Sequence, residues 1–219
     1  MSGTTPAPNR PELIEALQPA QPTELEHDER LGDVHVSGAQ LAEQDARGVT
    51  LDGCRLTDVD LSGSRLPDMR LAHVTIERCN LANLRAPRAA IRRTLISASR
   101  LTGVDLAHAS LTDVTIRDCR MDLASLRSCT LERVSFEECL LAQSDLLEAR
   151  LKHVSFADCD MSRVDLRDAR LDRCEIRRCK LSKLEGVTAL KGVSMPWPDI
   201  VEMAGVWAGA LGIEVLEDD

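Results

Sequence analysis

Three hexapeptides spaced twenty residues apart decide the fold: VTIRDC at 114–119, VSFEEC at 134–139 and VSFADC at 154–159. They belong to a shorter period that runs through most of the chain. From Leu51 to Leu181, every fifth residue is Leu, Ile, Met or Phe, with Ala86 as the one exception. No insertion or deletion interrupts this spacing, so the period of five is a property of the fold and not of one motif.

A period of five matches neither the 3.6-residue period of an α-helix nor the two-residue period of a β-strand. It matches a chain that turns a corner once in every pentapeptide. The large apolar residue, position i, and the residue at i−2 point inward, whereas positions i−1, i+1 and i+2 point outward. Four such sides close a square coil of 20 residues, which explains the longer spacing. Each coil stacks on the one before it, as in other solenoids.

Four tripeptides carry a resemblance to a known family: VDL at 104–106, ASL at 124–126, SDL at 144–146 and VDL at 164–166. They resemble the A(D/N)Lxx motif of the pentapeptide repeat family. The resemblance implies an all-β solenoid, a right-handed quadrilateral parallel β-helix. Weaker repeats extend the register backwards, so we expect residues 31–186 to form about eight coils.

All eight cysteines occupy the inward i−2 position, where they replace Ala, Val or Ser. We therefore interpret them as small buried hydrophobic residues. Stacked cysteines have parallel Cβ vectors, which suit a disulfide poorly, and single thiols without a CxxC pair offer no tetrahedral metal site. Free thiols fit a reducing cytoplasm, so we expect a cytoplasmic protein with no metal and no cofactor. The predicted structural column comprises Cys79, Cys119, Cys139, Cys159 and Cys179, with Ser99 filling its gap.

The first 30 residues are rich in proline and acidic side chains and lack the charged-then-apolar pattern of a signal peptide. We expect residues 1–30 to form a mobile arm, with a short helix at Glu12–Leu17 lying over the first coil. The longest apolar run, Met203–Ile213, is too short to span a membrane, so we expect no membrane association.

Residues 187–219 leave the five-residue register and are expected to cap the exposed strand edges of the last coil, ending in an acidic tail. Asp199 and Glu202 have the spacing of a capping box. They predict an α-helix from Ile200 to Leu211, stopped by Gly212.

Two faces of this predicted helix are apolar. We expect one face to cover the last coil, and it holds Ile200, Ala204, Trp207 and Leu211. The other face holds Met203, Val206 and Ala210. A helix that is apolar all round is buried all round, and many members of the family dimerise through this end, so we predict a homodimer. The alternative is that the chain's own tail, residues 213–216, covers the second face. The predicted interface comprises Met203, Val206, Trp207, Ala210 and Leu211.

The resemblance also implies a function, because well-known members of the family are acidic, DNA-mimicking dimers. They bind type II topoisomerases such as DNA gyrase and protect them from quinolones or peptide toxins. The net charge of −9 is consistent with this, but its distribution is not. Residues 1–30 have net charge −4 and residues 186–219 have −5, whereas residues 31–185 contain 24 basic and 24 acidic side chains. A DNA mimic needs rows of acid along the rod.

Two surface regions of opposite charge follow from the register. A local acidic patch is expected near the C-terminal end of the rod, at Asp145, Glu148, Asp165 and Asp168. The side that contains Leu51 and every twentieth residue after it has a net charge of +4. This side lacks the interleaved aromatic residues of nucleic-acid sites, which argues against direct nucleic-acid binding.

The sequence does not favour an enzyme. The five histidines are scattered, and none of the GxGxxG, P-loop, HExxH or GxSxG motifs occurs. A filled solenoid also lacks an obvious substrate pocket. We therefore expect a non-enzymatic scaffold whose rigid rod surface binds an unidentified macromolecule. The alternative is a gyrase-binding protection protein.

Overall fold

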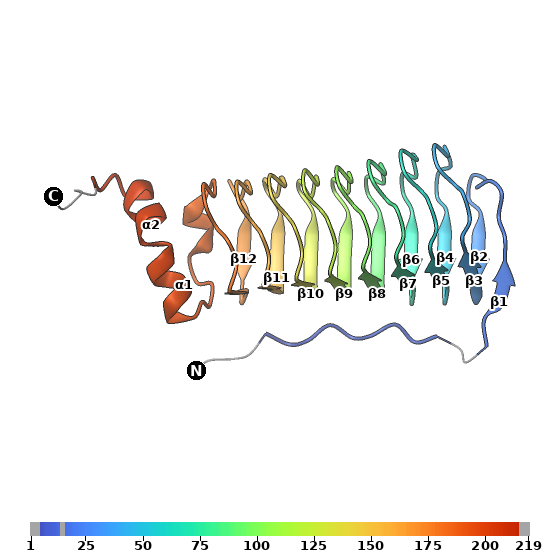
Figure 1. Ribbon diagram of the computed structural model, residues 1–219, viewed down its shortest axis with the longest axis horizontal. Coiled ribbons are helices and arrows are strands. Elements are labelled where there is room, and N and C mark those ends of the chain that lie inside the picture. The colour runs from blue at the N-terminus through green and yellow to red at the C-terminus, as the bar shows by residue number, and fades with distance from the viewer. Residues whose placement is uncertain (1–4, 14–15, 215–219) are drawn as a thin grey trace.

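The computed structural model describes residues 5–13 and 16–214 as a rod of about eight stacked coils, with helices at one end and an extended segment along the rod (Figure 1). The strands pair in parallel, and partner residues along the rod are twenty positions apart, as in Leu111, Leu131 and Leu151. The strands are β1 Gln18–Ala20, β2 Arg30–Gly32, β3 Val34–Ser37, β4 Thr50–Asp52, β5 Arg55–Thr57, β6 Arg70–Ala72, β7 Thr75–Glu77, β8 Ala90–Ser97, β9 Ser110–Arg117, β10 Thr130–Glu137, β11 Arg150–Ala157, β12 Arg170–Asp172 and β13 Glu175–Arg177.

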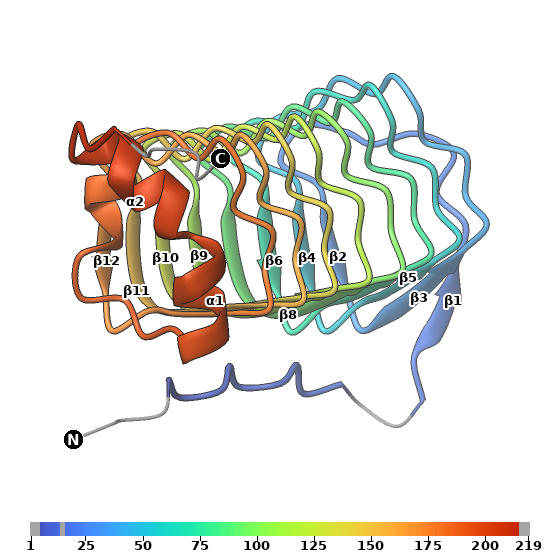
Figure 2. The same cartoon turned by 60° about the vertical axis from the view of Figure 1, so that its left-hand side comes forward.

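Each coil has four sides, which we number in chain order (Figure 2). Side 1 contains Leu51 and every twentieth residue from it, side 2 contains Leu56, side 3 contains Leu61 and side 4 contains Leu66. Sides 1 and 2 contain the strands β2–β13, whereas sides 3 and 4 are joined to their neighbours through single parallel bridges such as Asp145 to Asp165.

The inward positions form one continuous apolar core along the rod. The i and i−2 side chains are buried through almost the whole register, as the five-residue period predicts. Phe136 and Phe156 occupy equivalent positions in neighbouring coils and stack with their ring centroids 4.9 Å apart and their planes within 5°. Side chains of equal shape stacked in columns leave little empty space, so the core is filled and not hollow.

Every corner of the coil is built by a residue in the left-handed conformation. All i+2 residues from Asp28 to Lys183 have positive φ, and most of them are not glycine. Asp and Asn at positions such as Asp58 and Asn83 tolerate this conformation, whereas Arg93 and Leu123 adopt it without such a preference. The corners therefore carry backbone strain that the inter-coil hydrogen bonds must overcome.

The N-terminal region differs from its prediction in two ways. Sheet pairing begins at β1, whose Gln18 pairs with Val34 of β3, so the rod starts before residue 31. The predicted helix at Glu12–Leu17 is wrong for the described residues of that range, which are not helical; residues 14–15 lie outside the described part of the chain. Residues 5–13 instead run extended along the rod (Figure 1).

The C-terminal cap consists of a 3₁₀-helix, η1 Val187–Leu190, followed by α1 Trp197–Glu202 and α2 Ala204–Ala210. The predicted capping box is wrong, because α1 starts two residues before Asp199. The Asp199 carboxylate instead accepts a hydrogen bond from the Arg178 backbone N–H at 2.6 Å, a donor on the last coil. The predicted stop is confirmed: Gly212 has φ 71° and closes the end of α2.

Candidate interaction surfaces

Arginine–aspartate pairs join successive coils at the corners. In four of them, Arg Nε and Nη2 bind both carboxylate oxygens of the Asp twenty residues earlier, with both partners at left-handed corners. The fork geometry suits a guanidinium and a carboxylate. These forks are Arg78 with Asp58, Arg88 with Asp68, Arg133 with Asp113, and Arg178 with Asp158.

The predicted acidic patch does lie together on side 4 and its corner, but basic side chains lie among its members. Arg127 Nη2 lies 2.9 Å from Asp145 Oδ2, and Arg167 Nη2 lies 2.6 Å from Asp165 Oδ2. The hydrogen bond from Arg167 lowers the pKa of Asp165. Glu148 accepts a hydrogen bond from Ser128, and Asp168 forms no ion pair with the described residues. The patch is therefore partly neutralised and does not form a row of free carboxylates.

Side 1 is the more distinctive charged surface. Arg150 and Arg170 lie opposite each other in β11 and β12, and neither forms an ion pair with a described residue. Arg70 and Arg92 on the same side are also without an ion pair among the described residues. This side therefore keeps the positive character that the register predicts.

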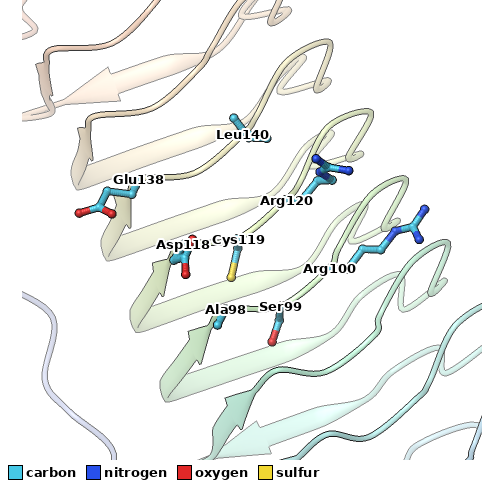
Figure 3. A pocket seen from close by; sticks show the side chains of 8 residues that line it. All are labelled: Ala98, Ser99, Arg100, Asp118, Cys119, Arg120, Glu138 and Leu140. Carbon is cyan, nitrogen blue, oxygen red and sulfur yellow. The ribbon is translucent and has the colours of Figure 1, made fainter.

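A shallow depression of about 420 Å³ crosses the corner between sides 2 and 3 (Figure 3). Arg100 and Arg120 extend from neighbouring coils on side 3, while Asp118 and Glu138 lie at the adjacent corner. The depression is open to solvent, and the buried Ser99 hydroxyl that lines it donates to the Ser97 carbonyl oxygen, so it has the character of a surface groove.

All eight cysteines are free and buried, in agreement with the inward register. Burial raises the pKa of Cys129 to about 12 and that of Cys119 to about 11. The neighbouring thiol of Cys139 raises the pKa of Cys159 to about 12. Thiols with such high pKa values form little thiolate near neutral pH, and the thiolate is the reactive species. Cys119, Cys129 and Cys159 therefore contribute to packing as neutral thiols.

Within residues 5–13 and 16–214, no group of three or more His, Cys, Asp or Glu side chains could hold a metal ion. Two apolar voids inside the rod measure about 30 Å³ each, which is too small for a substrate. His73 and His153 lie at the same corner, four coils apart, as the register predicts. None of the helices in the described part of the chain has the length and apolar character needed to cross a membrane.

The C-terminal end has an exposed apolar surface, although its composition differs from the prediction. Met203, predicted on the outward face, is buried in its own chain, and Val206 and Trp207 are half-buried against the core. Ala204, predicted to cover the last coil, is exposed, as are Ala210 and Leu211. Because both faces of the predicted helix are apolar, no signal in the sequence decides which of them packs inward. We define the end patch as the exposed side chains Trp197, Ile200, Val201, Leu211 and Ile213.

Two family models match this sequence. One, described as a pentapeptide repeat region, matches residues 70–146 and 117–185, and the other, described as eight copies of pentapeptide repeats, matches residues 37–71. Together they span more than half of the chain. The chain is a pentapeptide repeat protein. This membership confirms the resemblance, and with the parallel register of the coils it confirms the predicted β-solenoid.

Solved structures are similar to this pentapeptide repeat protein only at low identity. A trypsin-treated form of QnrB1, a plasmid-mediated fluoroquinolone resistance protein, is 16% identical, with 94% of this chain and 100% of that chain covered and a TM-score of 0.41. HetL, involved in heterocyst differentiation regulation in the cyanobacterium Nostoc sp., is 18% identical, with 80% and 92% covered and a TM-score of 0.33. None of the curated proteins matches the sequence. Likeness at this level carries no argument about function.

Proposed function

We propose that this protein is a non-catalytic cytoplasmic scaffold that forms a homodimer through its C-terminal end and presents the sides of the rod to a macromolecular partner. The filled core and the shallow surface grooves favour binding over catalysis. The continuous stacking of coils makes the rod a stiff support on which surface side chains keep fixed spacings.

The observation that carries the proposal is the end patch. Five of the seven exposed large hydrophobic side chains of the described residues belong to it, although α1, α2 and the residues after them form a small part of the chain. Trp197 is 72% exposed and Leu211 is 76% exposed. Exposed apolar side chains concentrated at one end of a rod are typical of protein interaction sites. At Gly205 and Gly209 on α2, no atom lies within 4 Å of an added Cβ, so another chain could approach the helix closely.

Sedimentation velocity tests the proposal. We expect the wild-type protein to sediment as a dimer, and Trp197→Glu and Leu211→Glu each to sediment as a monomer, because a carboxylate would be desolvated in the interface. Leu140→Glu is the matched control, since Leu140 is an exposed hydrophobic residue on side 3, away from the cap, and should leave the dimer intact. A monomeric wild-type protein at micromolar concentration would contradict the proposal.

Gyrase protection is the second candidate and follows from the family resemblance. Its specific support here is the cluster of carboxylates on side 4 near the C-terminal end, which would lie towards the centre of such a dimer. The ion pairs of Asp145 and Asp165 weaken this support. A supercoiling assay separates the two candidates: the protection function requires that a molar excess of the protein inhibits or shields gyrase, whereas a scaffold for another partner has no effect.

A further inference from the structure

Residues 5–13, which we call the arm, lie along the corner between sides 1 and 2 (Figures 1 and 2). We call the column of corner residues beneath them corner 1, and it consists of His73, Arg93, Asp113, Arg133, His153 and Arg173. The arm contacts both ends of this column. Thr5 Oγ1 donates a hydrogen bond to the Arg173 carbonyl oxygen at 3.3 Å, and the Glu12 backbone N–H donates to His73 Nδ1 at 3.1 Å.

From Thr5 to Glu12 the burial pattern of the arm has a period of three, and Leu13 at its end is also half-buried. Thr5, Pro8 and Pro11 are half-buried, whereas the residues between them are exposed. A period of three with prolines on the buried face is the signature of a polyproline II helix, which has three residues per turn and no internal hydrogen bonds. Proline fixes φ near the value this conformation needs, so the arm loses little conformational entropy when it binds.

The dimensions of the two structures match. Seven residue steps from Thr5 to Glu12, at ~3.1 Å each, cover roughly 22 Å. The five coils from Arg173 to His73, at ~4.8 Å each, cover roughly 24 Å. One polyproline II turn of ~9.3 Å therefore spans about two coils of ~9.6 Å, which fits the three-residue step from Asn9 to Glu12 against the two coils from Asp113 to His73.

The centre of the contact is a specific polar interaction. Asn9 donates from its backbone N and from its side-chain Nδ2 to the same oxygen, Oδ1 of Asp113, at 3.2 and 3.0 Å. Asp113 is buried, and Arg133 binds both of its carboxylate oxygens. A buried carboxylate needs hydrogen-bond donors, so corner 1 selects a segment that places an amide side chain here.

The arm leaves part of the surface beneath it unfilled and one buried polar atom of corner 1 without a hydrogen bond. His153 Nδ1 is buried without a hydrogen-bond partner among the described residues. A cavity of about 400 Å³ also remains between the arm and side 2, with Thr5, Ala7 and Pro8 on one wall and Ser135, Ser155 and Glu175 on another. A different extended segment could fill this space.

We propose that corner 1 and the adjoining strip of side 2 form a binding groove for an extended, proline-rich segment of a partner protein, and that the arm occupies this groove in cis as an autoinhibitory strap. The ligand class is a polyproline II segment with Asn or Gln opposite Asp113. The strap keeps the groove closed until a segment with better contacts displaces it. This groove is separate from the C-terminal end patch, so the proposal of a groove and the proposal of a homodimer are tested independently.

The full-length variant Asn9→Asp tests whether the arm is held by Asp113. Two carboxylates would then face each other, and we expect the backbone amides of residues 9 and 12 to exchange hydrogen at least tenfold faster than in the wild type, measured by NMR. Gln40→Glu adds the same charge at an exposed site on side 3 and should exchange like the wild type. The double variant Asn9→Asp with Asp113→Asn restores a donor–acceptor pair and should recover protection. Unchanged exchange in Asn9→Asp would overturn the strap.

A trans-binding experiment tests the groove itself. A fluorescein-labelled peptide with the sequence of residues 5–13, TPAPNRPEL, should bind the Asn9→Asp protein at least tenfold more tightly than the wild type, whose groove is occupied. A peptide with Gly in place of Pro8 and Pro11 should lose this preference. Equal binding of both peptides, or equal binding to both proteins, would refute a groove that selects polyproline II segments.

Discussion

Arg133 binds Asp113 from one coil further along the rod, with Nε 2.7 Å from Oδ1 and Nη2 3.1 Å from Oδ2. The same fork joins Arg78 to Asp58 on another corner, but there both side chains are about half exposed, whereas the Asp113 side chain is only 8% exposed. Two pairs of equal geometry therefore differ chiefly in their contact with water. Burial makes the loss of a partner costly, whereas water replaces a lost partner at an exposed site.

Removal of each arginine should show this difference. We expect Arg133→Gln to lower the free energy of unfolding by about 2 to 3 kcal/mol, because Asp113 would remain buried without its main partner. Arg78→Gln, the matched exposed control, should remain close to the wild type. Guanidinium chloride titration followed by circular dichroism measures both. Equal losses in the two variants would show that burial of Asp113 contributes nothing.

Acid should weaken the protein through Asp113. The hydrogen bonds from Arg133 lower the pKa of Asp113 from 3.8 to about 2 in the folded protein. A carboxylate with a lowered folded-state pKa stabilises the fold above its unfolded pKa and loses that contribution as the pH falls through the folded value. We therefore expect about 2 kcal/mol of stability to be lost between about pH 4 and pH 2.

Asp113→Asn should make the acid limb of the stability curve shallower, because it removes the buried carboxylate whose pKa is lowered to about 2. Asp58→Asn provides the exposed comparison and should leave the shape of that limb nearly unchanged. Chemical denaturation at half-unit pH intervals gives both curves. A wild-type stability that is constant from pH 4 to pH 2 would contradict the assignment.

The buried thiols should not react with thiol reagents while the protein is folded. Burial raises the pKa of Cys174 to about 11 as well as those of Cys119 and Cys129, and the core excludes large aromatic disulfides. We expect an Ellman titration at pH 8 to detect less than about one reactive thiol per native chain. The same titration in guanidinium chloride should detect all eight. Rapid reaction of several thiols without unfolding would contradict the packing of the core.

Glycine should stabilise a corner where a bulky residue holds a left-handed conformation. Leu123 has φ 61° and is 56% exposed, so its side chain contributes little packing. We expect Leu123→Gly to raise the free energy of unfolding by about 0.5 to 1 kcal/mol, as the relief of strain exceeds the added flexibility of the unfolded chain. Leu140→Gly, at an exposed position in an inter-coil bridge, should lower it by about 0.5 to 1 kcal/mol. Thermal unfolding of both variants shows whether each substitution raises or lowers the stability.

Most of the fold could be predicted from the sequence because one periodic rule governs the core. The inward direction of Phe136 and of the cysteine column follows from the register alone. The left-handed corners also had a visible signal, since Gly53, Asp58, Gly63 and Asp68 follow one another at the i+2 position. Where Arg or His occupies the i+2 position, the sequence does not indicate a left-handed corner. There the neighbouring coils hold the backbone in that conformation, which these residues do not prefer by themselves.

The binding surfaces were harder to predict because they depend on single contacts without a period. Nothing in the sequence of the arm points to Asp113, which lies 104 residues away and is recognised by one asparagine. At the cap, α1 and α2 meet at Met203, and this break turns Met203 inward and leaves Trp197 and Leu211 exposed. A continuous helix would have distributed the apolar side chains differently.

The unbroken register also determines which length changes the molecule tolerates. A duplication of twenty residues would add one coil and leave every downstream side chain facing its former direction. An insertion of five residues would also keep the inward direction of the apolar positions, yet it would rotate the remainder of the rod by a quarter turn and carry Arg150 and Arg170 from side 1 to side 2. Evolution can therefore exchange the faces of such a rod in a single step, with buried contacts altered only where the two coils meet at the insertion.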